Sequence, residues 1–366
     1  METPSKLELM STRGFASDNY AGIHPYVLNA ITDANHGHQS AYGEDEVTAE
    51  FQKLVKKLFG KNAVGFPVFN GTGANVVALQ AAIPRWGAVI AAATSHLNLD
   101  EGGAPEKMGG IKLWNVEIPK GNGKLTPELI QPELIDFGFV HRSQQAAVSI
   151  TNSSEYGTVY SLNEIKAITK QAKKHGLVTH MDGARLSNAA AALGLSFKQF
   201  TTDAGIDLVS MGGTKIGAMA AEAVIVTNSN TELGKRLVND LDYLRKTSMQ
   251  LASKMRFISA QLVALYSGRT PLAIELATHA NSMAAMLDKG LRKIARGNKA
   301  RLSLPVETQA NAVFPVMDAK LAKRLRENWH FYDWDQSIGQ YRLMCAWDTT
   351  EQDIEQFLLD VSEALS

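Results

Sequence analysis

Short apolar runs alternate with stretches of helical spacing through the first two thirds of the chain. The runs predict strands at 63–69, 88–92, 112–118, 146–151, 177–182, 207–210 and 223–227. Helical spacing predicts helices at 46–59, 74–83, 161–174 and 185–193. The segment Tyr42-Gly43-Glu44-Asp45 before the first helix is most simply an N-cap with acidic first-turn residues, and Ser161 with Glu164 forms a possible capping box for the third. Apolar strands connected through helices predict a three-layer α/β/α fold with a mostly parallel sheet.

The last third of the chain changes character. Residues 232–296 are mainly helical in pattern, and strands at 312–317 and 341–347 then alternate with helices at 319–328 and 350–365. This pattern predicts a smaller C-terminal α+β domain. We place the boundary inside the helical stretch, which gives a large domain at 1–255, including an N-terminal segment, and a small domain at 256–366.

Composition limits the possible classes of function. The 366 residues suffice for two structural units, and 45% hydrophobic with 20% charged residues is ordinary for a globular protein. Acidic and basic residues balance at 37 each, so nothing indicates a nucleic-acid or anionic membrane partner. Residues 1–8 lack a signal core, and no apolar stretch approaches the roughly 20 residues that span a bilayer. With Cys345 as the only cysteine, we expect a cytoplasmic location.

Two residues suggest a specific chemistry. Lys215 lies in a segment rich in glycine, 212–217, just after the predicted strand 207–210, and Asp182 ends the predicted strand 177–182. A pyridoxal-phosphate (PLP) enzyme needs a lysine for the covalent link to the cofactor and a carboxylate that keeps the pyridine nitrogen protonated. The alternative is a structural lysine in a loop, since lysines usually lie on the surface.

A candidate phosphate site lies between a predicted strand and a predicted helix. Gly71, Thr72 and Gly73 occupy this junction, where free N–H groups and the helix dipole attract anions. A plain glycine-rich connector is the alternative. The segment lacks the Gly-Lys-Ser/Thr of a P-loop and the third glycine of the dinucleotide fingerprint, so a nicotinamide enzyme is disfavoured.

Three further side chains are candidates for contacts with cofactor or substrate. His96, which follows the strand ending near residue 93, could stack on a cofactor ring and bond a substrate hydroxyl. Arg185 could bind the phenolic oxygen of the cofactor or hold an amino-acid carboxylate by a bidentate fork, and Arg342 could hold a carboxylate in the same way. The alternatives are a structural histidine and solvated arginines.

Taken in order, these residues resemble the threonine aldolase / β-eliminating lyase group of PLP enzymes, which has the aspartate aminotransferase-type fold. The similarity runs over most of the chain. It includes Ser17-Asp18, Tyr42-Gly43-Glu44-Asp45, Gly71-Thr72-Gly73-Ala74-Asn75, Ser95-His96, Gly102-Gly103, Asp182-Gly183-Ala184-Arg185, Lys215, Arg342-Leu343 and Trp347-Asp348.

The resemblance implies a role for each matching residue. Lys215 would carry PLP, Asp182 would pair with the ring nitrogen, and His96 would stack on the ring. The remaining roles would be phosphate binding by Gly71 and Thr72, and binding of the substrate carboxylate by Ser17, Arg185 and Arg342. The family forms dimers or dimers of dimers with shared sites, so Lys254 of a neighbouring subunit would approach the phosphate, with Arg256 close by.

The chain departs from the family pattern in two places. The segment 151–156, where typical members carry a second active-site histidine, reads Thr-Asn-Ser-Ser-Glu-Tyr. The usual run of three glycines after Arg-Lys is replaced by Thr247-Ser248-Met249. His36, His38 or Tyr156 are the candidates to compensate for the missing histidine.

The implied activity is cleavage of the Cα–Cβ bond of a β-hydroxy-α-amino acid, such as threonine or a phenylserine, to glycine and an aldehyde. His96 is the candidate base at the β-hydroxyl, and no metal ligand is assigned. One alternative is β-elimination or another amino-acid lyase reaction on the same scaffold, and another is a PLP-fold binding protein without catalysis.

Overall fold

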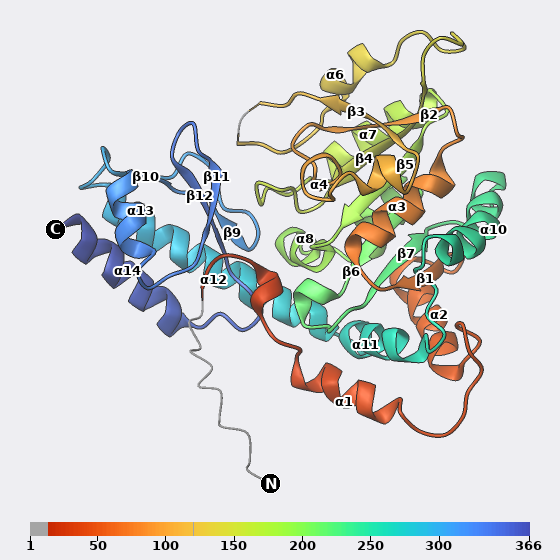
Figure 1. Cartoon of the computed structure of the whole chain (residues 1–366), viewed down its shortest axis with the longest axis horizontal. Helices are drawn as coiled ribbons and strands as arrows, with labels where there is room; N and C mark the ends of the chain where they lie inside the picture. The colour runs from red at the N-terminus through yellow and green to blue at the C-terminus, as the bar shows by residue number, and fades with distance from the viewer. Residues whose placement is uncertain (1–13, 120) are drawn as a thin grey trace.

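The computed structural model describes residues 14–119 and 121–366. Residues 1–8, in which we expect no signal peptide, lie outside the described residues. Figure 1 shows a large part built around one sheet and a smaller C-terminal part beside it. The strands of the large sheet are β1 (Val64–Val68), β2 (Gly87–Ala92), β3 (Lys112–Val116), β4 (Gln144–Thr151), β5 (Val178–Gly183), β6 (Leu208–Gly212) and β7 (Glu222–Val226).

The sheet has the strand order β1-β7-β6-β5-β4-β2-β3. Pairing is parallel from β6 through β3, and β7 runs antiparallel to both β1 and β6. The sheet is therefore mostly parallel, as predicted, and the carboxyl ends of its central strands meet at one edge.

Helices cover both faces of this sheet because alternate strand residues point to opposite sides. In β7, Val224 and Val226 pack into the cluster with α3 (Gly71–Ala82) and α10 (Glu232–Thr247). Ala223 and Ile225 pack into the other cluster, which contains the buried faces of α2 (Glu46–Phe59), α7 (Leu162–Lys174), α8 (Leu186–Leu193) and α11 (Arg256–Tyr266). The three-layer α/β/α prediction is confirmed.

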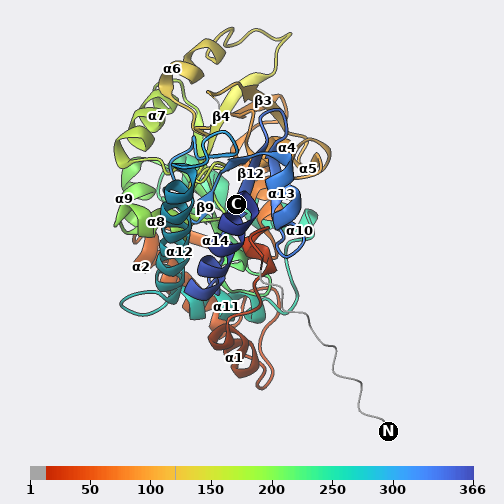
Figure 2. The same ribbon diagram turned by 90° about the vertical axis from the view of Figure 1, so that its left-hand side faces the viewer.

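The smaller sheet contains β8 (Leu302–Ser303), β9 (Ala312–Val313), β10 (Val316–Met317), β11 (Tyr332–Asp335) and β12 (Gln340–Met344). Its helices are α12 (Leu272–Ala295), α13 (Ala319–Leu325) and α14 (Glu351–Leu365), and Figure 2 shows α12 next to α14. Helix α12 contributes to the cores of both parts. The proposed boundary after residue 255 therefore stays a prediction.

The N-terminal segment joins the small part. The backbone N–H of Phe15 donates to His330 at 2.8 Å, and the N–H of Met344 donates to Phe15 at 2.8 Å. The Phe15 ring also stacks on Trp329. Asp18 then accepts from Arg185 of the large part at 2.7 Å and from Asn311 of the small part at 3.1 Å, so the segment bridges the two parts.

Several predicted elements need correction. The predicted strand 312–317 is two short strands, β9 and β10, separated by Phe314 and Pro315. Proline has no N–H to donate to a sheet, which accounts for the interruption. The predicted strand 341–347 ends at Met344, the helix 319–328 ends at Leu325, and the helical stretch 232–296 is three helices.

The structure also contains elements that the periodicity did not predict. These are α1 (Pro25–Asp33), α4 (His96–Leu99), α5 (Ala104–Lys107), α6 (Pro127–Ile130), α9 (Phe197–Phe200), β8 and β11. Most are too short for a hydrophobic period to register. The predicted caps are present: Asp45 accepts from Thr48, and Ser161 and Glu164 form a capping box. Within the described residues, no helix combines the length and apolar character needed to cross a bilayer.

Candidate active site

A cavity of about 230 Å³ lies at the carboxyl ends of the central strands. Ligands of open α/β sheets usually bind at this edge. The cavity is lined by Lys215, Asp182, His96, Gly71, Thr72 and Arg185, together with acidic and amide side chains that the sequence analysis did not assign.

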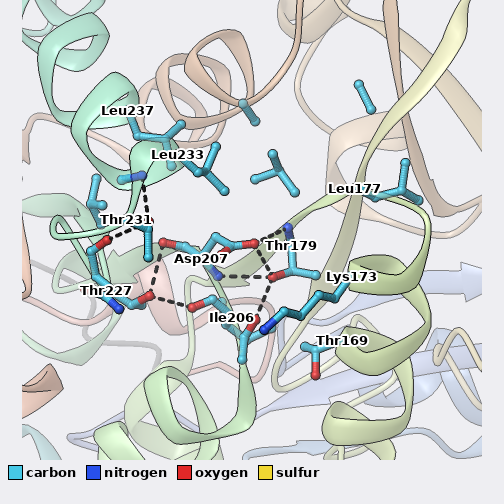
Figure 3. A pocket seen from close by; sticks show the side chains of 18 of the residues that line it. Thr169, Lys173, Leu177, Thr179, Ile206, Asp207, Thr227, Thr231, Leu233 and Leu237 are labelled. Atoms are coloured by element: carbon cyan, nitrogen blue, oxygen red, sulfur yellow. Dashed lines mark hydrogen bonds between the residues drawn. The ribbon is translucent and has the colours of Figure 1, made fainter.

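A larger cavity of about 880 Å³ lies at the opposite edge of the sheet (Figure 3). Several of its polar groups bond to one another: Asp207 accepts from the N–H and the hydroxyl of Thr179, both at 2.9 Å, and the Thr227 hydroxyl donates to the carbonyl of Ile206 at 2.6 Å. These groups are not available to a ligand, so volume alone does not make this cavity the better candidate.

Lys215 lies in a tight turn directly after β6. Glu222, at the start of β7, fixes this turn by accepting from the N–H groups of Gly213 at 2.9 Å and Thr214 at 3.3 Å. A Cβ at Gly213 would lie 2.4 Å from the carbonyl of Ala221, so only glycine fits there. Burial, and then the nearby charge of Arg185, lower the pKa of Lys215. A lysine of lowered pKa is a better nucleophile near neutral pH.

Asp182 lies at the end of β5 and is buried. One carboxylate oxygen accepts from the N–H of Ala184 at 2.9 Å and the other from the side-chain amide of Asn75 at 3.1 Å. Burial acts to raise the pKa of Asp182, but the charge of His96, the Ala184 N–H and the charge of Lys215 outweigh it, so the pKa lies below its usual value. Asp182 therefore stays anionic inside the protein.

His96 begins α4 and belongs to the same network. Its Nδ1 lies 3.0 Å from Oε1 of Glu101, an oxygen that also accepts from Asn75 at 2.8 Å. Burial opposes the charged imidazole, but the bond to Glu101 and the charge of Asp182 together raise the pKa of His96. Asn75 thus connects Glu101, the partner of His96, to Asp182.

The predicted phosphate site is the N-terminus of α3. Asn70 caps the helix by accepting from the N–H of Gly73 at 2.7 Å, while Gly71 and Thr72 line the cavity. Gln250 closes the back of this turn: its side chain accepts from the N–H of Phe69 at 3.0 Å and lies where a Cβ on Gly73 would go. The free N–H groups of the first helical turn make this end of the cavity suited to an anion.

The two arginines that were predicted to bind a carboxylate have different surroundings. Arg185 already holds a carboxylate of the protein, because its Nε and Nη2 donate to Asp18 at 2.7 and 2.8 Å. Arg342 in β12 donates from Nη2 to the carbonyl of Ala16 at 3.1 Å, and its buried Nε has no partner among the described residues. Burial, and then the charge of Arg185, lower the pKa of Arg342 to about 10.

The structure brings together six of the residues predicted from the sequence, the six named above as lining the cavity. Ser17 lies outside and lines a neighbouring cavity of about 340 Å³. Neither Arg342 nor Lys254 lines the 230 Å³ cavity, and Lys254 is exposed. The three compensating candidates are not lining residues either: His36 and His38 are exposed, and Tyr156 packs against Phe314 and Trp334.

The cavity residues that were given no role from the sequence include Asn75, Glu101, Glu155 and Glu222. Each lies in or next to a segment that contains a predicted site residue. This proximity in the sequence is the signal that could have identified them. No group of three or more histidine, cysteine or acidic side chains in the described ranges has an arrangement suited to a metal ion.

Comparison with known proteins identifies the family of this chain. A family model described as beta-eliminating lyase matches residues 14–320. A low specificity L-threonine aldolase from a Pseudomonas strain is 40% identical over 96% of this chain and 98% of its own, and one from Pseudomonas aeruginosa is 38% identical over 96% and 97%. A solved threonine aldolase from Leishmania major is 28% identical and superposes with a TM-score of 0.86, covering 96% of this chain and 99% of its own.

Fold and comparisons define the chain as a lyase of the PLP-dependent α/β class. It belongs to the beta-eliminating lyase family. The predicted family, fold class and enzyme class are thereby confirmed. Members of this family depend on PLP.

Proposed function

We propose that this lyase binds PLP and cleaves β-hydroxy-α-amino acids such as threonine between Cα and Cβ, giving glycine and an aldehyde. The observation that carries the proposal is the presence of the Lys215 amine and the Asp182 carboxylate in one cavity. The names of the relatives support the choice of threonine over other amino acids.

The residues of the cavity fit PLP by their chemistry. Lys215, with its lowered pKa, suits the covalent link, and the anionic Asp182 suits a protonated ring nitrogen. His96 would pack on the ring, while the N-terminus of α3 at Gly71 and Thr72 would hold the phosphate. When bound, PLP accepts the electron pair that is released as a bond to Cα breaks.

The two arginines would orient the substrate. Arg342 is a largely buried cation with no ion pair among the described residues and an unpartnered Nε, so a substrate carboxylate would supply its missing anion. Arg185 would add its third nitrogen, since Asp18 uses only Nε and Nη2. Ser17, from the segment between the two parts, would contribute its hydroxyl. Such a clamp sets which bond to Cα lies perpendicular to the ring and breaks.

The product mixture tests the reaction. Threonine cleavage gives glycine and acetaldehyde, whereas β-elimination gives 2-oxobutyrate and ammonia. We expect the first pair from the PLP-loaded protein. The second pair would support the elimination alternative, and no product from a panel of β-hydroxy amino acids would support a binding protein without catalysis.

Cofactor attachment is tested separately. Reduction of the PLP-loaded protein with borohydride should leave the cofactor covalently bound after denaturation and dialysis. Lys215→Ala should lose this label. The matched control Lys53→Ala, at an exposed position on α2, should retain it. Absence of label from the wild-type protein would end the proposal.

We also propose a homodimer or homotetramer in which a second copy completes each site. Apolar side chains along α1 and in two loops face solvent in the single chain, namely Tyr26 (58% exposed), Leu28 (50%), Met219 (53%) and Met249 (69%). Lys254, which follows Met249 closely in the sequence, is also exposed. We propose that it reaches the phosphate site of the partner subunit.

Subunit complementation tests this sharing. If Lys254 acts on the partner's cofactor, a mixed oligomer of Lys215→Ala and Lys254→Ala chains contains sites with both lysines intact. Activity should then return on mixing and refolding the two inactive proteins. No recovery in a mixed oligomer of confirmed composition would place Lys254 outside the shared site. A cytoplasmic location, proposed from the single cysteine, is testable by fractionation.

A further inference from the structure

Glu155 is a cavity residue to which neither the sequence pattern nor the clamp described above gives a role. It follows β4, at the place where the expected second histidine is missing, and lines the cavity together with Lys215 and Asp182. Only one of its two carboxyl oxygens is used. Oε1 accepts from the backbone N–H of His96 at 2.8 Å and from the hydroxyl of Thr151 at 3.0 Å. Oε2 is buried and has no hydrogen-bond partner among the described residues.

A buried carboxyl oxygen without a donor is costly, and a catalytic role or a bond supplied by a ligand is one reason for which proteins retain such a group. The two donors on Oε1 fix the orientation of the carboxyl group. They leave Oε2 available to a hydroxyl in the cavity. Oε2 of Glu101 in the same cavity is likewise buried without a partner among the described residues.

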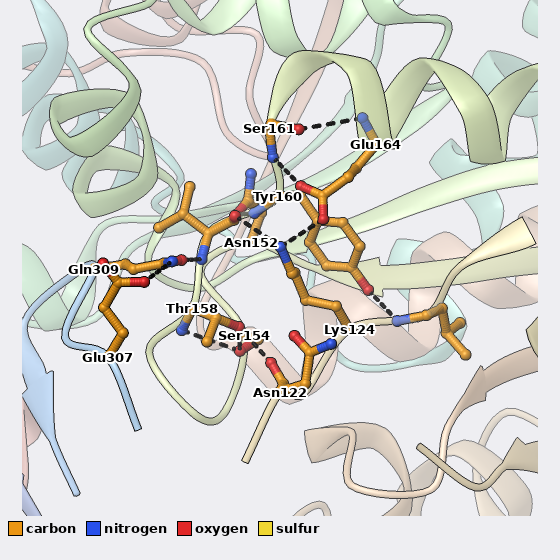
Figure 4. A network of polar contacts seen from close by, with 12 residues as sticks. Asn122, Lys124, Asn152, Ser154, Thr158, Tyr160, Ser161, Glu164, Glu307 and Gln309 are labelled. Atoms are coloured by element: carbon orange, nitrogen blue, oxygen red, sulfur yellow. Dashed lines mark hydrogen bonds and ion pairs between the residues drawn. The ribbon is translucent and has the colours of Figure 1, made fainter. Parts of the chain in front are cut away.

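A polar network holds the segment that carries Glu155 (Figure 4). Asn152 accepts from the N–H of Tyr160 at 3.1 Å, and the hydroxyls of Ser154 and Thr158 lie 2.6 Å apart. Gln309, from the small part of the molecule, accepts from the N–H of Val159 at 2.7 Å. The loop on both sides of Glu155 is therefore tied to its surroundings, which positions the carboxyl group against the cavity.

The surroundings also suit proton transfer. Burial raises the pKa of Glu155 to about 7, the charge of Asp182 acts in the same direction, and the N–H of His96 acts against it. Arg185, Lys215 and His96 are the basic groups that line the same cavity, and Glu101 and Glu222 are further acids there. A group whose pKa lies near neutrality can both take up and release a proton.

We propose that Oε2 of Glu155 takes the proton from the β-hydroxyl of the substrate as the Cα–Cβ bond breaks. This inference rests on the proposed function. The O–H bond breaks, its proton moves to Glu155, and the oxygen's electrons form the carbonyl of the departing aldehyde. The electron pair of the Cα–Cβ bond stays on the Cα side, where the bound cofactor accepts it. Cα later gains one proton to become glycine, and Glu155 releases the proton it took, so the reaction as a whole neither consumes nor produces protons.

This assignment is an alternative to the prediction that His96 is the base, which stays a prediction. Nδ1 of His96 is already engaged by Glu101, and its backbone N–H is the group that orients Glu155. His96 keeps the role of packing on the ring.

Glu155→Gln tests the proposal because the amide keeps an acceptor for His96 but cannot take a proton. Threonine cleavage should fall by about 10²–10⁴-fold, the usual range for loss of a general base. Two measurements that involve no β-oxygen should stay at wild-type levels: the visible absorbance of PLP bound to the protein, and its change on titration with glycine. Exchange of the α-proton of glycine with solvent deuterium should also continue at the wild-type rate.

Glu307→Gln is the matched control. Glu307 is exposed, contacts Gln309 beside the same loop at 3.2 Å, and does not line the cavity. It should leave threonine cleavage unchanged.

Two results would overturn the proposal. Cleavage by Glu155→Gln at the wild-type rate would exclude proton transfer through this residue. Equal loss of cleavage, glycine binding and cofactor absorbance would show that Glu155 only positions His96. Failure of the proposed function is distinguishable, because the wild-type protein itself would then release no glycine from threonine.

Discussion

Asn75 donates its side-chain N–H to Asp182 at 3.1 Å and, from the same nitrogen, to Glu101 at 2.8 Å. One neutral amide therefore bridges two buried carboxyl groups. The bridge connects Asp182, which is proposed to face the ring nitrogen, with Glu101, the partner of His96. The positions of both carboxyl groups therefore depend on one side chain of α3.

Replacing Asn75 should destabilise the protein and alter the site. Asn75→Ala removes the donor from both carboxyl groups, and an unsatisfied buried group costs about 1–3 kcal/mol. We expect a loss of that order in the free energy of unfolding, measured with urea, together with weaker PLP binding. Asn239→Ala, on the exposed face of α10, is the control and should stay within about 0.5 kcal/mol of wild type. Unchanged stability and PLP affinity would mean that the bridge contributes nothing.

Arg342 should affect substrate binding more than stability. Arg342→Met removes a desolvated cation that has no ion pair among the described residues, so the free energy of unfolding should stay the same or increase. A charge-assisted hydrogen bond is worth about 1.5–3 kcal/mol, so KM for threonine should rise by roughly 10- to 150-fold. Arg342→Lys should recover little, because an ammonium cannot form the fork. A KM at the wild-type value would remove Arg342 from the substrate site.

The pair Asp18–Arg185 is testable by a double-mutant cycle. Asp18 is 3% exposed and also accepts from Asn311 at 3.1 Å. Removing one partner of a buried ion pair typically costs about 3–5 kcal/mol. We therefore expect a large loss in unfolding free energy for Asp18→Asn, and a smaller loss for Asp18→Asn combined with Arg185→Gln than the sum of the two single changes. Strict additivity would mean that the two charges are not coupled.

His180 should make stability depend on pH. It lies in β5 between the hydroxyls of Ser149 at 2.8 Å and Ser210 at 2.9 Å, and burial lowers its pKa to about 4. Between about pH 6.5 and pH 4 the unfolded chain binds a proton here that the folded protein does not. The free energy of unfolding should therefore decrease as the pH falls through this window, by at most about 1.4 kcal/mol per pH unit from this group.

The measurement is urea unfolding at several pH values. His180→Asn should flatten the slope between pH 6.5 and 4, whereas His36→Asn, at an exposed position, should not. Equal slopes for His180→Asn and wild type would show that the imidazole is not excluded from protonation in the folded state.

The central elements were predictable because a buried surface leaves a period in the sequence. Helix 46–59 has the same bounds in the structure, and most strands of the large sheet differ from the prediction by one or two residues at each end. The small sheet was harder to predict, because strands such as β9 and β10 have two residues each and carry no period.

The sequence by itself determined the sheet with its covering helices, the positions of Lys215 and Asp182 at strand ends, and the glycine-rich turn at α3. These features depend on residues that are close together in the chain, so the spacing of apolar residues and the choice of turn residues predict them. Only the tertiary structure decided that Arg185 pairs with Asp18, that Asn75 bridges two acids, and that Glu155 presents an unpartnered oxygen to the cavity. These contacts join residues that are 26 to 167 positions apart or depend on which oxygen a neighbour occupies. Such pairings follow from the path of the chain in space, which no local pattern of hydrophobic and polar residues records.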